Sequence, residues 1–284
     1  MGMSLSADAS PGVASNVDAE QFGVDPELRP RDQSFIRDVL IIARRSIRQL
    51  PREPEAVFPA LLIPVFFMAV NIGSLEKLTE SALAIDYKAF QLPVGIVFAV
   101  TGISRGASLV ADLNSGYFDR LLMTPVSRLA LLIGTMAADF VLVALMTLPV
   151  LCLGFIVGVG FHNGVLGFLV FVGISALWGM VFPGFTYAIA FKTASPAAVA
   201  SATILFFPFA FLTTTFLPKD QLNGTLDAVA TVNPVTYILE ALRSLLTEDW
   251  NMSAIGPALL AIGVVGILSI GLALTALKGR VSRN

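Results

Sequence analysis

GVLGFLVFVGISALWGMVFPGFTYAIA, residues 164–190, runs without a single charged side chain. A helix that crosses the hydrocarbon core of a bilayer needs about 20 mainly apolar residues. The whole chain of 284 residues is 56% apolar and only 13% charged, and its mean hydropathy is +0.81. Soluble domains carry about 25% charged residues. These figures predict an all-α polytopic membrane protein.

Apolar runs of similar length lie on both sides of this stretch and predict six transmembrane helices. Their bounds are about Ala56–Leu75, Phe90–Ala111, Leu131–Val157, Gly164–Ala190, Ala197–Leu217 and Ala254–Leu277. An even number of spans places both termini on one side. That side would hold fourteen Lys and Arg residues and the other four, so the positive-inside rule puts both termini in the cytosol. We expect a multi-pass protein of the plasma (inner) membrane.

The chain divides into three regions before any motif is considered. Residues 1–33 lack the apolar core of a signal peptide and are typical of a disordered cytosolic tail. Residues 34–52 predict an amphipathic helix, with Arg37, Arg44, Arg45 and Arg48 largely on its polar side. Such a helix lies in the membrane interface, whereas a spanning helix would incur about 2.5–3.5 kcal/mol for each central Arg. Residues 53–284 form the six-helix domain.

A second segment outside the spans precedes the last of them. Residues 218–253 are too apolar for a plain loop, and the outer helical segment is expected over about 218–250. Within it, Asn233 and Pro234 occupy cap and first-turn positions of a helix that runs to residue 246. Glu240 and Arg243 stand at a spacing that allows an ion pair along this helix.

The polar stretch DLNSGYFDRLLMTPVSR, residues 112–128, separates the second and third spans. Only about one and a half helical turns fit before Thr124-Pro125, because a proline disfavours helix at the residue before it. A short helix over about 113–123 is predicted across the cytosolic ends of two spans, with aromatic side chains available for a groove on another protein. An ordinary loop with aromatic anchors at the interface is the alternative.

Two ionisable residues are expected at membrane depth, Arg105 and Asp139. Buried charges are usually paired, so an Arg105–Asp139 pair is plausible as a structural clasp or as a gate. Aromatic residues within the spans could line an apolar path or simply face lipid and neighbouring helices. The path candidates are Phe98, Phe182, Phe185, Tyr187, Phe206 and Phe207. Because the chain has one histidine, His162, no multi-histidine metal site is expected.

The order of these elements resembles that of permease subunits of type-2 ABC exporters, and most of all the daunorubicin-resistance permease group. GYFDRLLMTPVSR, residues 116–128, is similar to the stretch that forms the coupling helix of that family, and NPVTYILEALRSLL, residues 233–246, is similar to its outer motif. Asp112-Leu-Asn-Ser-Gly116 departs from relatives, which often carry a run of acids and Arg there. The resemblance implies coupling roles for Gly116, Tyr117, Phe118, Asp119, Arg120, Leu121 and Leu122, and an outer motif of Asn233, Pro234, Tyr237, Glu240 and Arg243.

The resemblance implies a permease that depends on a separate motor. A P-loop requires Gly-Lys followed by Ser or Thr, and the chain contains no Gly-Lys pair. Mg-ATP would therefore bind to a partner ABC ATPase, in two copies, and this chain would bind no cofactor. A second permease chain, the same or a sibling, would complete the complex. The expected function is export of an amphipathic drug or lipid, with membrane lipids and no nucleic acid among the partners.

Two other classes of function compete with export. A proton-coupled secondary transporter would have to rely on Asp139, because the predicted spans offer no other carboxylate for a proton relay. An intramembrane enzyme is disfavoured because neither H-E-x-x-H nor G-x-S-x-G occurs. The chain is therefore expected not to be an enzyme by itself.

Overall fold

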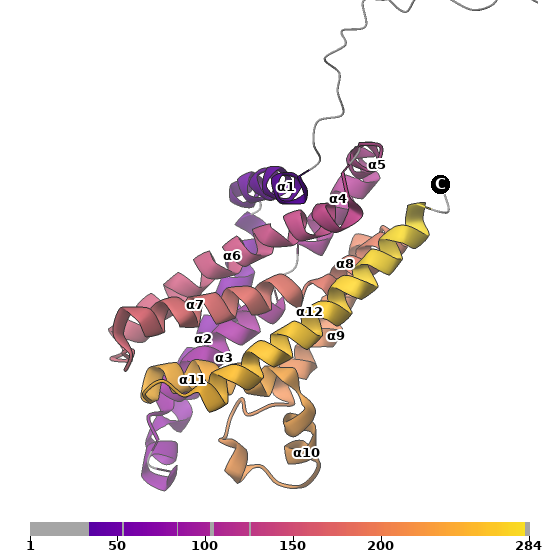
Figure 1. Ribbon diagram of the computed structural model, residues 1–284. Helices are drawn as coiled ribbons and strands as arrows, with labels where there is room; N and C mark the ends of the chain where they lie inside the picture. Colours follow the sequence, from indigo (N-terminus) through magenta and orange to yellow (C-terminus); the bar gives the residue numbers. More distant parts are fainter. Residues whose placement is uncertain (1–33, 53, 84, 103–104, 125, 282–284) are drawn as a thin grey trace, which may run out of the picture. The chain divides into compact units, whose positions relative to one another are not determined.

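The computed structural model describes residues 34–52, 54–83, 85–102, 105–124 and 126–281, and it describes no side chain at residues 52, 54–61, 63, 64, 83, 101, 102, 119 and 205–207. The predicted tail, residues 1–33, lies outside this description. All regular structure in the described residues is helical (Figure 1). The helices are α1 (Phe35–Gln49), α2 (Pro54–Leu83), α3 (Tyr87–Gly102), α4 (Gly106–Asn114), α5 (Tyr117–Leu122), α6 (Arg128–Ile156), α7 (Gly164–Val181), α8 (Gly184–Thr193), α9 (Pro196–Phe211), α10 (Gly224–Val232), α11 (Pro234–Thr247) and α12 (Met252–Val281), with short 3₁₀ turns at Leu50–Arg52 and Lys219–Gln221.

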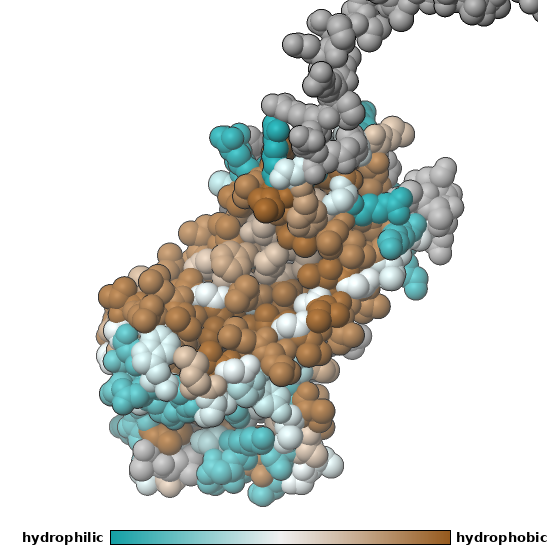
Figure 2. Space-filling view, viewed as in Figure 1, coloured by the Kyte–Doolittle hydropathy of each residue, from teal (hydrophilic) through white to brown (hydrophobic). Residues whose placement is uncertain are grey.

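Three helical stretches among the described residues are long and apolar enough to cross a membrane: Arg128–Ile156, Gly164–Thr193 and Met252–Arg280. On the face drawn in Figure 2, hydrophobic side chains form a broad band over α6, α7 and α12, with hydrophilic side chains at either end. Exposed leucines such as Leu145, Leu169 and Leu268 belong to these helices. An apolar exposed band between polar ends is what a bilayer covers, so the chain is a multi-pass membrane protein.

The second predicted span, Phe90–Ala111, is not one continuous helix. The helix α3 ends at Gly102 and α4 begins at Gly106, with Arg105 in the N-cap position of α4 at φ −78° and ψ 15°. A glycine on each side of the interruption lowers helix propensity there. Arg105 therefore marks a junction between two helices within this predicted span.

The fifth predicted span, Ala197–Leu217, also extends too far. The helix α9 stops at Phe211, and the chain then turns through Thr213, Thr214 and Thr215, whose side chains are buried. The hydroxyls of Thr213 and Thr215 each lie within hydrogen-bond distance of the Ala210 carbonyl, at 2.7 and 2.8 Å. Threonine hydroxyls that bond local carbonyls in this way compete with helical hydrogen bonds, which explains the early end.

A joint interrupts the apolar stretch 164–190 at Phe182 and Pro183, between α7 and α8. Proline lacks an N–H group, so a break leaves backbone carbonyls without helical partners. The Ser269 hydroxyl of α12 donates to the Val181 carbonyl at 2.7 Å. The close approach requires glycine at position 184, because a Cβ there would lie 2.7 Å from Ser269 Oγ. α12 thus supports the joint directly.

Two buried clusters lie on either side of this joint. One contains Trp178, Ile238 and Leu242 and joins α3, α6, α7, α11 and α12. The other contains Leu109, Phe118, Tyr187 and Phe191 and joins α4, α5, α6, α8, α9 and α12. In Figure 1, the helices α4 and α5 and the C-terminal end of α12 lie toward the top of the view. The helices α10 and α11 and the first turns of α12 lie toward the bottom.

The predicted amphipathic helix is present as α1 and packs on α6. Ile42 and Ala43 are buried there, and a Cβ at Gly134 of α6 would lie 2.7 Å from the Ile42 Cβ. Glycine at 134 therefore permits the close contact. Ile36 and Leu40, one turn apart, stay 69% and 63% exposed. The helix consequently has a second apolar side that no described part of the chain covers.

Candidate functional site

The short helix predicted over about 113–123 is present over a shorter range, as α5, Tyr117–Leu122, because residues 113 and 114 belong to α4. Gly116 precedes it with φ +69°, a left-handed conformation that glycine adopts without steric cost. The next helix, α6, begins when the Ser127 side chain accepts a hydrogen bond from the Ala130 backbone N–H at 3.1 Å. A sharp turn before α5 separates this six-residue helix from α4, and the capped start of α6 follows it.

The structure corrects the expectation that Phe118 of α5 is available to a partner, whereas Tyr117 stays partly exposed. Phe118 is only 3% exposed, and its ring lies 5.3 Å from that of Phe191 on α8. Leu122 packs against the same cluster. Phe118 therefore anchors α5 to the membrane helices.

A different set of side chains on and after α5 faces outward. Met123 is 87% exposed, Arg120 is exposed, and Leu121 is partly exposed. The Asp119 side chain is outside the described residues. The outward side of α5 and the residue after it therefore present a methionine, a leucine and one cation. We call Arg120, Leu121 and Met123 the α5 edge.

An arginine of α1 contacts the first residue of α5 and an aspartate of α4. Arg45 Nη1 and Nη2 donate to the two carboxylate oxygens of Asp112 at 3.2 and 3.3 Å, and the guanidinium lies 3.7 Å from the centre of the Tyr117 ring. The Arg45 and Asp112 side chains remain 34% and 27% exposed. Exposed ion pairs and cation–π contacts each contribute about 0.5–1 kcal/mol, so this contact serves more to position α5 than to stabilise the fold. Sequence reasoning missed it because the partners stand 67 residues apart.

Arg105 and Asp139, the predicted intramembrane pair, are both buried, at 5% and 1% exposure. Arg105 Nη2 donates to the Gln49 side-chain oxygen at 3.4 Å. The Asp139 carboxylate of α6 accepts a hydrogen bond from the Tyr187 hydroxyl of α8. Each charge thus has a described polar neighbour that the sequence did not indicate, and their pairing with each other stays a prediction.

The outer motif connects three helices. Asn233 caps α11 by accepting from the Val235 N–H at 3.0 Å, and its amide nitrogen donates to the carbonyls of Phe209 and Leu212, at 2.8 and 3.0 Å. Pro234 opens α11 at its first turn. The Tyr237 hydroxyl donates to the Thr231 carbonyl of α10 at 2.6 Å. The helix predicted over residues 233–246 is confirmed, and its asparagine also closes the end of α9.

Arg243 does not form the expected ion pair with Glu240 along α11. Its Nε donates to the Phe90 carbonyl at 3.1 Å, while Nη1 and Nη2 donate to the Thr214 hydroxyl and carbonyl, at 2.9 and 2.7 Å. The guanidinium also lies 3.4 Å from the centre of the Phe90 ring. Burial lowers the pKa of Arg243 to about 9, against the opposite influence of Glu240 and Tyr87, so it stays protonated at neutral pH. Arg243 therefore joins α3, α11 and the turn after α9.

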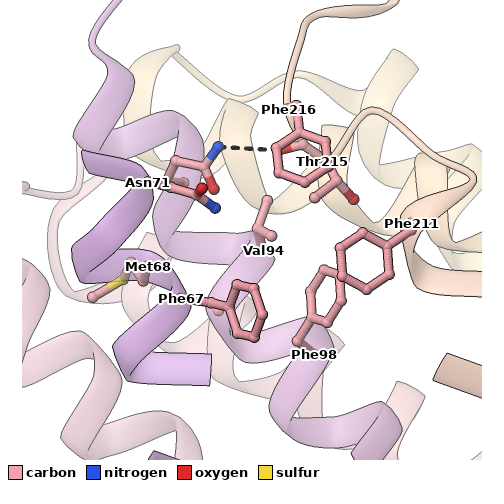
Figure 3. Close-up of a pocket in the computed structure, with 10 residues that line it drawn as sticks. Phe67, Met68, Asn71, Val94, Phe98, Phe211, Thr215 and Phe216 are labelled. Carbon is pink, nitrogen blue, oxygen red and sulfur yellow. Dashed lines mark hydrogen bonds between the residues drawn. The ribbon is translucent and has the colours of Figure 1, made fainter. Parts of the chain in front are cut away.

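One predicted path residue, Phe98, lines a small pocket between α2, α3 and the end of α9 (Figure 3). The rings of Phe98 and Phe211 meet edge to face with centres 4.6 Å apart. The pocket offers about 10 Å³ of free space, room for roughly one water molecule, whereas drug-sized ligands occupy about 300–1,000 Å³. The Gln91 amide at its rim donates to the Thr215 carbonyl at 3.1 Å.

The remaining path candidates lie elsewhere. Tyr187 is fully buried against Asp139, and Phe182 is 6% exposed beside Trp178, with ring centres 5.0 Å apart. Both are packing residues within the chain. Phe185 lines a groove between α8 and α12. The side chains of Phe206 and Phe207 are outside the described residues. The path candidates whose side chains are described are therefore not gathered at one passage within a single chain.

Comparison with known proteins adds independent information on this arrangement. A family model described as "ABC-2 type transporter" matches residues 37–247. The chain is 24% identical over 233 residues to the probable doxorubicin resistance ABC transporter permease protein DrrC of Mycobacterium tuberculosis (strain H37Rv), covering 79% of this chain and 84% of that protein.

Two further relatives show similar coverage. The daunorubicin resistance ABC transporter permease protein DrrB1 of Streptomyces coeruleorubidus is 23% identical over 261 residues, covering 89% of this chain and 85% of its own length. The putative transport permease ycf38 of Cyanophora paradoxa is 24% identical over 236 residues, covering 78% of each chain. The resemblance inferred from the motifs at 116–128 and 233–246 is confirmed by these matches.

Proposed function

Because the chain belongs to the ABC-2 type transporter family, we propose that it is the transmembrane subunit of an ATP-driven exporter of amphipathic molecules. A member of that family is a membrane subunit of a transporter and not an enzyme by itself. A separate ABC ATPase, expected in two copies, would bind and hydrolyse Mg-ATP. A second permease chain, identical or a sibling, would complete the assembly.

The observation that carries the proposal is the placement of α5. Phe118 fixes this helix to α8, and Arg45 holds its first residue, Tyr117, from the side of α1. The α5 edge is left exposed, which is the arrangement expected of a helix that seats in a groove on a partner. Since α5 is fixed at two points, closure of the ATPase would move it together with α1 and α8, as a rigid-body displacement of the spans.

The proposed topology has six spans with both termini in the cytosol. The helices α2 and α9 and the pair α3 and α4 supply the spans beyond the three stretches that are already long and apolar enough. The cations at 120, 128, 192, 278 and 280 then lie on the cytosolic side. The exposed Ile36 and Leu40 of α1 would insert at the interface, with the neighbouring arginines at the headgroups.

The proposed substrate is an amphipathic drug or a lipid taken from the cytosol or the inner leaflet. The names of two relatives refer to doxorubicin and daunorubicin resistance, which makes doxorubicin the first probe. The small pocket around Phe98 has too little free space for such a molecule. A path would therefore form between permease chains and not within one of them.

The partnership is tested by purifying the chain from its native membrane in mild detergent. We expect a stoichiometric companion that carries a Walker A P-loop, identified by mass spectrometry, and ATP-dependent uptake of doxorubicin by inverted vesicles that contain both chains. A preparation that transports without any such ATPase would contradict the proposal.

The alternative function, proton-coupled transport, rests on Asp139, a buried carboxylate that accepts from Tyr187. The variant Asp139→Asn keeps an oxygen for the Tyr187 hydroxyl but cannot take up a proton. We expect ATP-driven transport by this variant to stay within about fivefold of the wild type, since replacing a charged acceptor by a neutral one in a retained hydrogen bond costs about 1 kcal/mol. Uptake driven by a pH gradient in the wild type and lost in Asp139→Asn would favour the secondary transporter.

A further inference from the structure

A groove lies between α8 and α12 and has no role in the transport cycle proposed above. It encloses about 600 Å³ and is open on one side. On α8 it is lined by Phe185, Ile189 and Lys192, which recur on one helical face. On α12 the residues at 272, 275, 276 and 279 recur in the same way, and Arg280 follows at the end. Its wall is therefore apolar toward the middle of the helices and cationic at one end.

The groove lies along one side of an extensive contact between the two helices, which share a buried cluster that includes Ala190 and Ala273. A Cβ at Gly184 would lie within 3 Å of Ser269, so contact there is as close as backbones allow. Further along, the small residues Ala188, Ala276 and Gly279 leave space between the helices. Leu272 stays 51% exposed on the wall, so the opening faces the surroundings of the membrane helices and not the buried core.

The two cations lie where a lipid headgroup would lie. Lys192 is in the last turn of α8 and Arg280 in the last turn of α12. Among the described residues that line the groove there is no carboxylate. An anion at this position would thus meet two positive charges and no acidic side chain of the wall, and cationic pockets between transmembrane helices suit anionic headgroups.

We propose that this groove binds one anionic phospholipid from the leaflet on the side of the C-terminus, which is the cytosolic leaflet in the topology given above. The phosphate would lie between Lys192 and Arg280, with an acyl chain along Phe185, Ile189 and Leu272. The site requires only that the chain is embedded in a membrane, so it stands or falls independently of ATP-driven export.

The test uses the full-length protein, stripped of lipid in detergent and titrated with dioleoyl phosphatidylglycerol, with bound lipid counted by native mass spectrometry. The variant Lys192→Gln with Arg280→Gln should bind phosphatidylglycerol roughly 30-fold more weakly than the wild type. The matched control, Lys278→Gln with Arg128→Gln, removes two exposed cations that do not line the groove and should bind normally. Dioleoyl phosphatidylcholine should bind weakly to every variant.

A second variant keeps the charges and fills the groove. Ala276→Phe places a ring where the acyl chain would lie, so phosphatidylglycerol should be lost although Lys192 and Arg280 remain. Soluble glycerol 3-phosphate should not displace the lipid, because it lacks the acyl chain. Equal binding by the double glutamine variant and its control would mean that the cations only serve the helix C-termini, and this would overturn the proposal. Full binding by Ala276→Phe, or displacement by glycerol 3-phosphate, would overturn it as well.

Discussion

The double substitution Leu121→Glu with Met123→Glu is expected to abolish ATP-driven transport and stimulation of the partner ATPase, while the protein still inserts and folds. Met123 is 87% exposed and Leu121 is partly exposed, so neither change introduces a buried charge. Two carboxylates on the α5 edge would face the groove of the partner, and loss of one strong interface residue weakens binding roughly 30-fold or more. Co-purification of the ATPase and uptake by inverted vesicles measure the effect.

The control for this experiment is Met252→Glu, because Met252 is a methionine with 68% exposure at the first residue of α12, on the other end of the helices in Figure 1. It should transport normally. Phe118→Glu should instead fail to fold, since it buries a charge against Phe191. Wild-type ATPase stimulation by the Leu121 and Met123 double variant would show that α5 is not the contact.

Replacement of Arg243 should cause a large loss of stability in a protein that still folds. Arg243→Met removes three hydrogen bonds and leaves the Phe90 and Thr214 carbonyls buried without those donors. Unsatisfied buried polar groups cost about 1–3 kcal/mol each. A total loss near 3 kcal/mol corresponds to a fall in the melting temperature of roughly 5 °C for a chain of this size. Thermal unfolding in detergent, followed by tryptophan fluorescence, gives the value.

Two further variants make the Arg243 measurement specific. Arg128→Met removes an exposed arginine and should leave the melting temperature unchanged. Thr214→Val removes one hydroxyl partner of Arg243 and should cost about 1 kcal/mol. A melting temperature of Arg243→Met equal to that of Arg128→Met would show that the three hydrogen bonds do not hold the outer segment in place.

Local patterns in the sequence predicted the helices that carry their own signals. The block at Thr124-Pro125 and the Asn233-Pro234 cap each act within a few residues, and α5 ends and α11 begins where they predict. The apolar stripe of α11, with Ile238 and Leu242, is buried as its spacing indicates. Membership of the family followed from the same two motifs.

The errors arose where a distant partner decides the outcome. Glu240 is the nearest acid along α11, but Arg243 binds Phe90 and Thr214, which are 153 and 29 residues away. Phe118 could have faced either side of a helix of one and a half turns, and only Phe191 fixes its direction. Spacing alone contains neither of these long-range contacts. The early end of α9 has a local cause, because the hydroxyls of Thr213 and Thr215, which extend the apolar run in sequence, lie within hydrogen-bond distance of the Ala210 carbonyl.

The lengths of the membrane helices have a consequence for the lipid that surrounds them. The helix α6 has 29 residues, which at 1.5 Å per residue is about 43 Å, against about 30 Å for the hydrocarbon of an average bilayer. The difference must be taken up by tilt, by extension into the headgroup region or by local thickening of the bilayer. Each increases in cost as the bilayer thins. Bilayer thickness is therefore a variable that any reconstitution of this protein has to control. We expect insertion of the protein to be less favourable in short-chain lipids.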